Sequence, residues 1–451
     1  MPSPVLITAS ILLVVAIVPP GPNARTAAAD NRHAVSSSAA ARSAVRQRRV
    51  RQLIGQLDAD LRSVRVRATR ELLRLGPEIL PDLPPPELLP DAAVRQAVRR
   101  IRLKLERQQA AASVRSTRVT LRRQTRPLAE LLRIIGTATR NRIDVSGLPA
   151  ATARRRFTVE YDRKPFWEVI DDLAARGKLH VVGDGGAVTL SARNRTAEPR
   201  EVAVCYSGPF RIAVEGVERK PLLGNRDHNK LRLCLSLLAE PRLRPLFLTI
   251  AAGNIKPTAT GTSIVPLVRD ARYERPLGEG GKSAPLLLDF KIPASARFGE
   301  IDLGGRMSMT TAAGEETIRF RQPTSARDVA RRRGGVTVTL RDMTFGRKSR
   351  GERSARVRVA VSYDTGGPAF ESHRTWVFHN RVYLLTKDGR RIDRSPGLTT
   401  SLQADGAVAV GYRFDHLKLP PADYDFVYVA PTLIIDVPIE FTLKKLPVSH
   451  D

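Results

Sequence analysis

Hydrophobic residues between positions 50 and 112 recur every three to four residues, which is the period of an amphipathic helix. Gly76 and Pro77 end one stretch, and a proline-rich segment at 81–90 separates it from the next. The pattern predicts a helical segment over 50–112, preceded at 30–49 by a linker rich in Ala, Ser and Arg. Three apolar faces carry this prediction: Leu53, Ile54, Leu57 and Leu61; Val66, Thr69, Leu72 and Leu73; Val94, Val98, Ile101 and Leu105.

A second pattern is an internal repeat at 117–192, whose positions correspond at a constant offset of 38. In each copy a short alternating strand leads to a proline, then to a helix with apolar residues at i, i+3, i+4 and i+7, then to another strand. Gly185 and Gly186 turn the chain into a closing strand. The repeat predicts a compact α+β domain in which helices cover one face of a small sheet. Matched pairs include Val119 with Phe157, Pro127 with Pro165, Leu131 with Val169, Ile135 with Leu173 and Ile143 with Val181.

Two of these segments resemble known families. Residues 66–77 and 91–95 are similar to fragments of a HEAT-type repeat, with a spacing shorter than a full repeat, and a plain helical hairpin fits almost as well. The duplicated pattern at 117–192, with its recurring "strand, x-Pro-Leu/Phe, helix, strand" order, resembles the short N-terminal (STN) domain of secretins and TonB-dependent receptors. That resemblance implies a periplasmic interaction module that has no catalytic residues.

From Glu201 onward the period changes to two, which is typical of strands with one buried face. Two antiparallel β-sandwiches are predicted, at 201–322 and 334–447, with a basic linker at 323–333. Runs beginning at Phe210 and Leu231 each match a run 126 residues later, and Phe290–Pro293 matches one 127 residues later. The offsets predict two sandwiches of similar topology, with chance matching of alternating strands as the alternative.

The length of 451 residues suits about three domains of ordinary size, so the chain is predicted to be a multidomain α+β protein. Lysine and arginine number 75 against 45 acidic residues, and the resulting formal net charge of +30 favours anionic partners. Aromatic residues make up only 5% of the chain, which leaves few rings to stack on single-stranded nucleic acid.

The first residues have the pattern of a signal peptide at 1–29. An apolar run at 5–18, too short to span a bilayer comfortably, is followed by Pro19–Pro22 and by the small residues Ala27–Ala29. No Lys or Arg precedes the run, which leaves a misassigned start or an uncleaved anchor as alternatives. Export predicts a periplasmic or cell-envelope protein without a transmembrane span after signal removal, and it argues against nucleic acid as the partner.

The residue types that carry chemistry are sparse. Cys205 and Cys234 lie in strand-like runs and are a possible disulfide in an oxidising compartment, with two reduced buried thiols as the alternative. His373, His379 and His416 are the nearest set of possible metal ligands, with surface histidines as the alternative. The glycine-rich segment at 278–283 lacks the first glycine of a P-loop and lies between strands. The chain is therefore predicted to be no enzyme and to hold no metal or cofactor.

Clusters of arginine are candidates for binding an anionic polymer, with an arginine-biased, solvated surface as the alternative for any single cluster. The candidates are Arg46, Arg48, Arg49 and Arg51; Arg99 and Arg100; Arg154, Arg155 and Arg156; and Arg331, Arg332 and Arg333.

Together these observations predict an exported, non-enzymatic scaffold or protein-interaction protein that binds other envelope proteins. A binding module for anionic polysaccharide or another anionic polymer is the alternative, and a hydrolase or metalloenzyme assembled from distant residues is a third. The order of segments is similar to that of uncharacterised envelope proteins of planctomycete-type bacteria.

Overall fold

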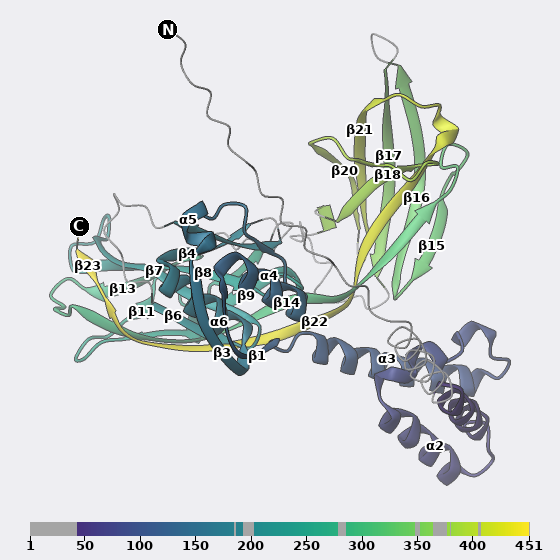
Figure 1. Cartoon of the computed structure of the whole chain (residues 1–451), viewed down its shortest axis with the longest axis horizontal. Helices are drawn as coiled ribbons and strands as arrows, with labels where there is room; N and C mark the ends of the chain where they lie inside the picture. The colour runs from purple at the N-terminus through teal and green to yellow at the C-terminus, as the bar shows by residue number, and fades with distance from the viewer. Residues whose placement is uncertain are drawn as a thin grey trace, which may run out of the picture. The chain divides into compact units, whose positions relative to one another are not determined.

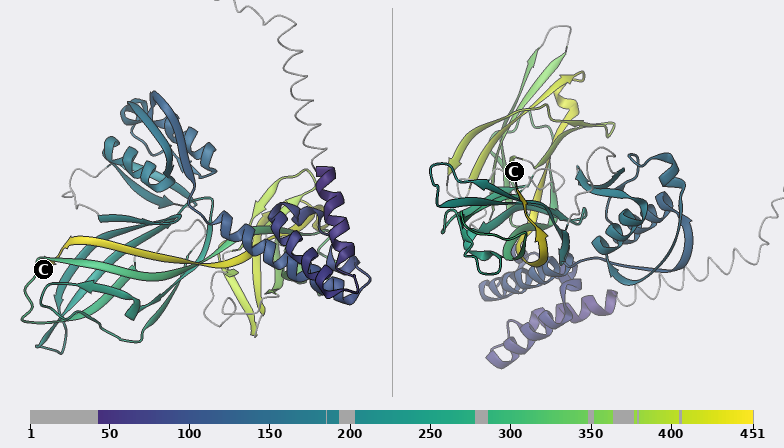
Figure 2. Two further views of the ribbon diagram at one scale, coloured as in Figure 1. Left: turned by 90° about the horizontal axis from the view of Figure 1, so that it is seen from below. Right: turned by 90° about the vertical axis from the view of Figure 1, so that its left-hand side faces the viewer.

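The structure is a computed structural model, and it describes residues 43–184, 186–192, 203–277, 286–347, 352–363, 377–378, 380–404 and 407–450. The chain is a mixed α+β protein with several separate sheets, as its sequence pattern predicted (Figures 1 and 2). It divides after Glu106 into two compact units. Within the described ranges, no helix combines the length and the apolar character needed to cross a bilayer. The predicted signal peptide at 1–29 lies outside the described residues.

The first unit is helical. It contains a helix at residues 43–56, α2 (Arg62–Leu75), η1 (Pro77–Asp82), η2 (Pro86–Leu88) and the first part of α3 (Ala92–Ser113). The predicted apolar face of α3 is buried, whereas Leu61 is 67% exposed because it precedes α2 rather than continuing the stripe before it. Residues 43–49, predicted as linker, are helical and lead into the fully buried Val50.

The second unit begins with the duplicated module. Its elements are β1 (Arg118–Pro127), α4 (Leu128–Thr139), β2 (Ile143–Asp144), α5 (Ala150–Arg154), β3 (Arg156–Pro165), α6 (Phe166–Gly177), β4 (Leu179–Asp184) and β5 (Ala187–Ala192). The bounds of β1 and α4 recur 38 residues later in β3 and α6. Both helices follow a proline and end at a left-handed residue, Arg140 or Lys178. The strands form two small sheets, β1-β3 and β2-β5-β4, rather than the single sheet predicted.

Two β units follow, each with an apolar core between a sheet of its own and part of a seven-stranded sheet that the two units share. The first contains β6 (Ala203–Ser207), β7 (Phe210–Pro221), β8 (His228–Ala239), β9 (Arg244–Ala251), η3 (Ala252–Asn254), β10 (Ile255–Thr258), β11 (Val265–Pro266), β12 (Arg272–Pro276), β13 (Leu286–Pro293) and the first part of β14 (Glu300–Phe320). The second contains β15 (Val329–Arg333), β16 (Val336–Arg347), β17 (Arg353–Tyr363), β18 (Arg381–Thr386), β19 (Arg391–Asp393), β20 (Leu398–Ala404), β21 (Ala407–Leu417), η7 (Pro421–Asp423) and the first part of β22 (Tyr424–Pro447), after which comes β23 (Ser449–His450).

The two β units share one strand order. In the first, β6, β7, β8, β13 and β11 lie side by side, and β15, β16, β17, β21 and β20 do so in the second. The bulge between Val214 and Gly216 in β7 recurs between Leu340 and Asp342 in β16, at the predicted offset of 126. The hydrogen-bond register pairs Val217 with Leu233 and Met343 with Val357. Strands β8 and β17 therefore correspond at an offset of 124 residues. Val357 of the second β unit matches Leu233 of the first, and not Leu231 as predicted.

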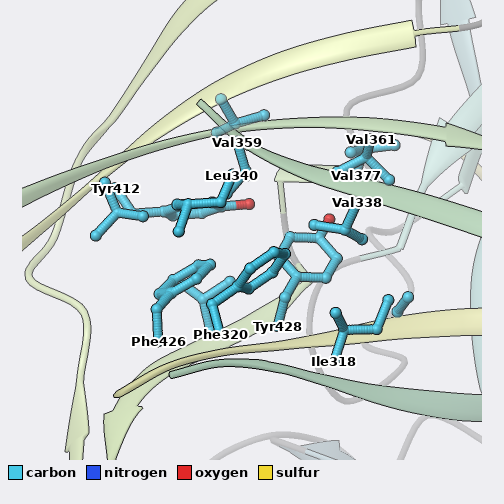
Figure 3. Packing of buried hydrophobic residues seen from close by; sticks show 14 of the residues in the cluster. Ile318, Phe320, Val338, Leu340, Val359, Val361, Val377, Tyr412, Phe426 and Tyr428 are labelled. Carbon is cyan, nitrogen blue, oxygen red and sulfur yellow. The ribbon is translucent and has the colours of Figure 1, made fainter. Parts of the chain in front are cut away.

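The β units exchange strands through β14 and β22, which pair antiparallel from Glu300–Pro447 to Phe320–Phe426. Met307 and Phe441 belong to the core of the first β unit, whereas Phe320 and Phe426 belong to that of the second. Figure 3 shows the rings of Phe320 and Phe426 in this second core, together with core residues from β16, β17 and β21. The second β-sandwich was predicted to comprise residues 334–447. The second half of β22, within that range, packs instead in the core of the first β unit.

Two further predictions differ from the structure. Residues 329–333 form strand β15 rather than linker, because they pair with β16. Cys205 and Cys234 are free thiols, and they lie on β6 and β8 with β7 between them. Two strand spacings amount to about 9.6 Å, beyond the reach of a disulfide. Burial raises the pKa of Cys205 to about 11.

Candidate interaction surfaces

The second copy of the repeat is docked on the first β unit. Trp167 of α6 is 1% exposed, and its indole N–H donates a hydrogen bond of 2.9 Å to the carbonyl of Pro209 at the β6–β7 turn. Asp171, one turn further along α6, accepts hydrogen bonds from Arg211 Nε at 2.8 Å and from Tyr206 Oη at 2.8 Å. Burial, with the Asp171 carboxylate beside it, raises the pKa of Tyr206. A buried aromatic ring and a hydrogen-bonded ion pair thus hold this face.

A buried carboxylate links the first copy of the repeat to the same β unit. Glu240 is fully buried and accepts hydrogen bonds from the backbone N–H of Thr117 at 2.8 Å and from its hydroxyl at 2.9 Å. Arg242 Nε donates to the same carboxylate at 2.7 Å. Asn141, which follows α4 in the first copy, donates to Glu240 and accepts from the backbone N–H of Arg242. The charge is therefore compensated where water does not reach it.

The first copy of the repeat carries an open groove of about 710 Å³. Aliphatic side chains of α4 and β2 form much of its lining, and three exposed arginines stand along it. No hydrogen bond or ion pair with the described part of the chain engages their guanidinium groups, although the charge of Arg142 attracts the nearby Asp144 carboxylate. Glu130, which also lines the groove, is paired with Arg126. The lining includes Ala129, Leu132, Ile143 and Val145, with Arg133, Arg142 and Arg154.

One sequence-predicted arginine, Arg154, lies in this groove. The others are dispersed, and several have local partners. Arg46 forms an ion pair with Asp82 at 2.6 Å, Arg156 donates to the carbonyl of Thr125, and Arg155 lies over the ring of Phe157. Arg49 lies 4.0 Å from Glu71, and Arg331 stacks on Phe320. Arg332 is exposed and also has a local partner. The other exposed candidates are Arg48, Arg51, Arg99, Arg100 and Arg333.

The sequence reasoning missed a basic face on α2. Arg62, Arg67 and Arg70 line a shallow surface depression together with Ser63, Val66 and Glu71, whose carboxylate lies 4.0 Å from Arg49 and 3.9 Å from Arg74. None of the three guanidinium groups has a hydrogen-bond or ion-pair partner among the described residues. Their spacing of five and three residues places them on neighbouring rows of one helix, and this was the available signal.

Side chains that could do chemistry do not gather in the described ranges. No three His, Cys, Asp or Glu residues there are grouped so that they could hold a metal ion. His416 Nδ1 lies 2.8 Å from Glu352, whereas His373, His379 and the segment 278–283 lie outside the described residues.

Comparison with known proteins adds little. No family model matches the chain, and no curated protein does. A solved structure, a conserved domain protein from Bacillus anthracis, shares 7% sequence identity, covering 53% of this chain and 89% of its own, with a TM-score of 0.17. A likeness of that size carries no conclusion about fold or function.

Proposed function

We propose that this chain is an exported, non-enzymatic interaction protein of a bacterial cell envelope, with the STN-like module at 117–192 as its binding part. The observation that carries the proposal is the groove of the first copy, where buried and partly buried apolar side chains and three exposed arginines line one open surface. The second copy supports it, because an equivalent helix face there already holds a protein surface through Trp167 and Asp171.

Two experiments test this proposal. A tagged chain expressed in its own bacterium should be found in the periplasmic or membrane fraction, with its N-terminus removed near Ala29, and deletion of residues 1–29 should keep it in the cytoplasm. Affinity capture from the solubilised envelope should then recover a protein that survives washing in moderate salt. A cytoplasmic location of the intact chain contradicts export, and an empty capture contradicts the interaction role.

A second function, binding of an anionic polymer, is favoured by the α2 face. The arginines at 62, 67 and 70 are exposed, unpaired and close together, which is the arrangement that attracts a chain of negative charges. Val66 between them is itself 40% exposed and adds an apolar contact.

Binding to heparin distinguishes a specific face from diffuse positive charge. Replacing the three α2 arginines by serine should weaken binding about tenfold at moderate salt and flatten the salt dependence. The control removes the same charge from the first β unit, through Arg226→Ser, Arg272→Ser and Arg275→Ser. Equal losses in the two triple variants indicate that only the net charge matters.

A further inference from the structure

We infer that the groove of the first copy receives a turn-forming protein segment that carries an Asp or Glu beside an apolar side chain. This inference rests on the proposed interaction function and names the chemistry of the partner. Its basis is the internal repeat, which shows the same helix face twice, once occupied and once open.

The offset of 38 pairs each docking residue of the second copy with a groove residue of the first. Trp167 corresponds to Ala129, and Asp171 corresponds to Arg133. In the second copy these positions meet the β6–β7 turn of the first β unit. In the first copy the equivalent face lines the groove.

The part of the occupied face that lies on β4 also has a counterpart in the groove of the first copy. Gly183 corresponds to Val145 of the groove, and a Cβ at Gly183 would lie 2.6 Å from Leu238 Cδ2. Leu238, from β8, packs in the core of the module. The occupied face therefore receives a turn, an ion-pair partner and an aliphatic side chain from one neighbouring β unit.

The differences between the copies define the missing occupant. Alanine in place of tryptophan removes the ring that fills the second face, which leaves room for an apolar side chain against the partly exposed Ile143 and Val145. Arginine in place of aspartate reverses the charge at the position that holds the ion pair. Arg142 and Arg154 add to the same sign, so the occupant presents a carboxylate where the β6–β7 hairpin presents Arg211.

Two other occupants fit less well. The β6–β7 hairpin of a second copy of this chain would bring Arg211 against Arg133, which is repulsive. A carbohydrate or phosphate polymer would satisfy the arginines but leave the aliphatic lining in contact with polar groups. A protein segment with both features complements the whole groove.

The test uses the purified full chain and a phage-displayed library of disulfide-closed twelve-residue peptides, selected at physiological salt. Selected peptides should carry Asp or Glu within a few positions of Leu, Ile, Phe or Val. Ala129→Trp should weaken their binding about tenfold or more, because tryptophan fills the groove as it fills the second face. The helix tolerates this residue, since α6 carries it at the equivalent position. Ala138→Trp, on the exposed side of α4, is the matched control and should bind as the original does.

Charge exchange provides the second arm. Arg133→Asp should lose the acidic peptides and, when used for a new selection, should enrich peptides with Arg or Lys. Arg122→Asp, an equal charge change on β1 outside the groove, should leave binding within about twofold. The inference is overturned if no peptide exceeds background, if selected peptides lack carboxylates, or if Ala129→Trp and Ala138→Trp behave alike. Those outcomes leave capture of an envelope protein intact, so the broader proposal is judged separately.

Discussion

The two copies of the 38-residue repeat have the same framework and opposite surfaces. Their helices have equal length and equal caps, and their core positions are apolar in both, as in Leu131 and Val169 or Ile135 and Leu173. They differ at the outward positions, where Ala129 and Arg133 stand in place of Trp167 and Asp171. The comparison teaches that the core determines the fold of each copy, while a few surface residues decide whether its face is covered by the same chain or left open.

The largest effect is expected from Trp167→Ala. The substitution removes a fully buried ring and its hydrogen bond to Pro209, and a loss of about 4 kcal/mol in the free energy of unfolding follows from such cavities. Urea denaturation followed by circular dichroism measures it. Ala129→Trp, the reciprocal change in the open copy, should alter stability by less than about 1 kcal/mol. Similar losses of stability in both variants would contradict the view that the second face is covered and the first is open.

A smaller loss, about 3 kcal/mol, is expected from Glu240→Ala. It leaves Arg242 and the polar groups of Thr117 and Asn141 without their shared carboxylate in a site closed to water. Glu240→Gln, which keeps the shape and removes the charge, should lose less. The first copy uses Asn141 for this link, whereas the second copy has Leu179 at the equivalent position. A neutral result for Glu240→Ala in thermal unfolding would contradict the link.

The ion pair between Asp171 and Arg211 is expected to contribute about 2 kcal/mol, since both groups are mostly buried and hydrogen-bonded. A double-mutant cycle of Asp171→Ala and Arg211→Ala measures the coupling by urea denaturation. Arg133→Ala, at the equivalent position of the open copy, should have almost no effect on stability. A coupling near zero would mean that Trp167 holds the face without the charge pair.

The smallest effect concerns Gly183 and Val145. A methyl group at Gly183 approaches Leu238, whose flexible end can give way, so Gly183→Ala should lose about 1 kcal/mol. Val145→Ala in the open groove loses less, because that side chain is only partly buried. Thermal unfolding of the two variants side by side compares the two losses of stability. A larger loss for Val145→Ala would contradict the tighter packing of the second copy.

The sequence was most informative where a pattern is local. The prolines before α4 and α6 and their apolar spacing predicted both helices, and the alternating runs predicted most long strands. Alternation does not identify a strand's partner, so the exchange between β14 and β22 stayed hidden. The predicted disulfide differed from the structure for the same reason, because β7 comes between the strands of Cys205 and Cys234.

The candidate groove was visible only in part. Arg154 was singled out for its charge, but its neighbours Arg133 and Arg142 belong to other elements that the fold brings together. Ala129 looks like an ordinary helix residue until it is placed beside Trp167. Glu240 and Asn141 lie 99 residues apart, a separation at which no local pattern joins them.

The exchange of strands also sets the order in which the molecule is completed. A ribosome makes residues 300–312 of β14 early, but their partners at 434–447 emerge only after all other strands of the second β unit. Until then the first β unit has an open edge with a row of unpaired peptide groups, the kind of edge that recruits strands from other molecules. The chain is therefore most exposed to aggregation when its synthesis is slow or halts near residue 430.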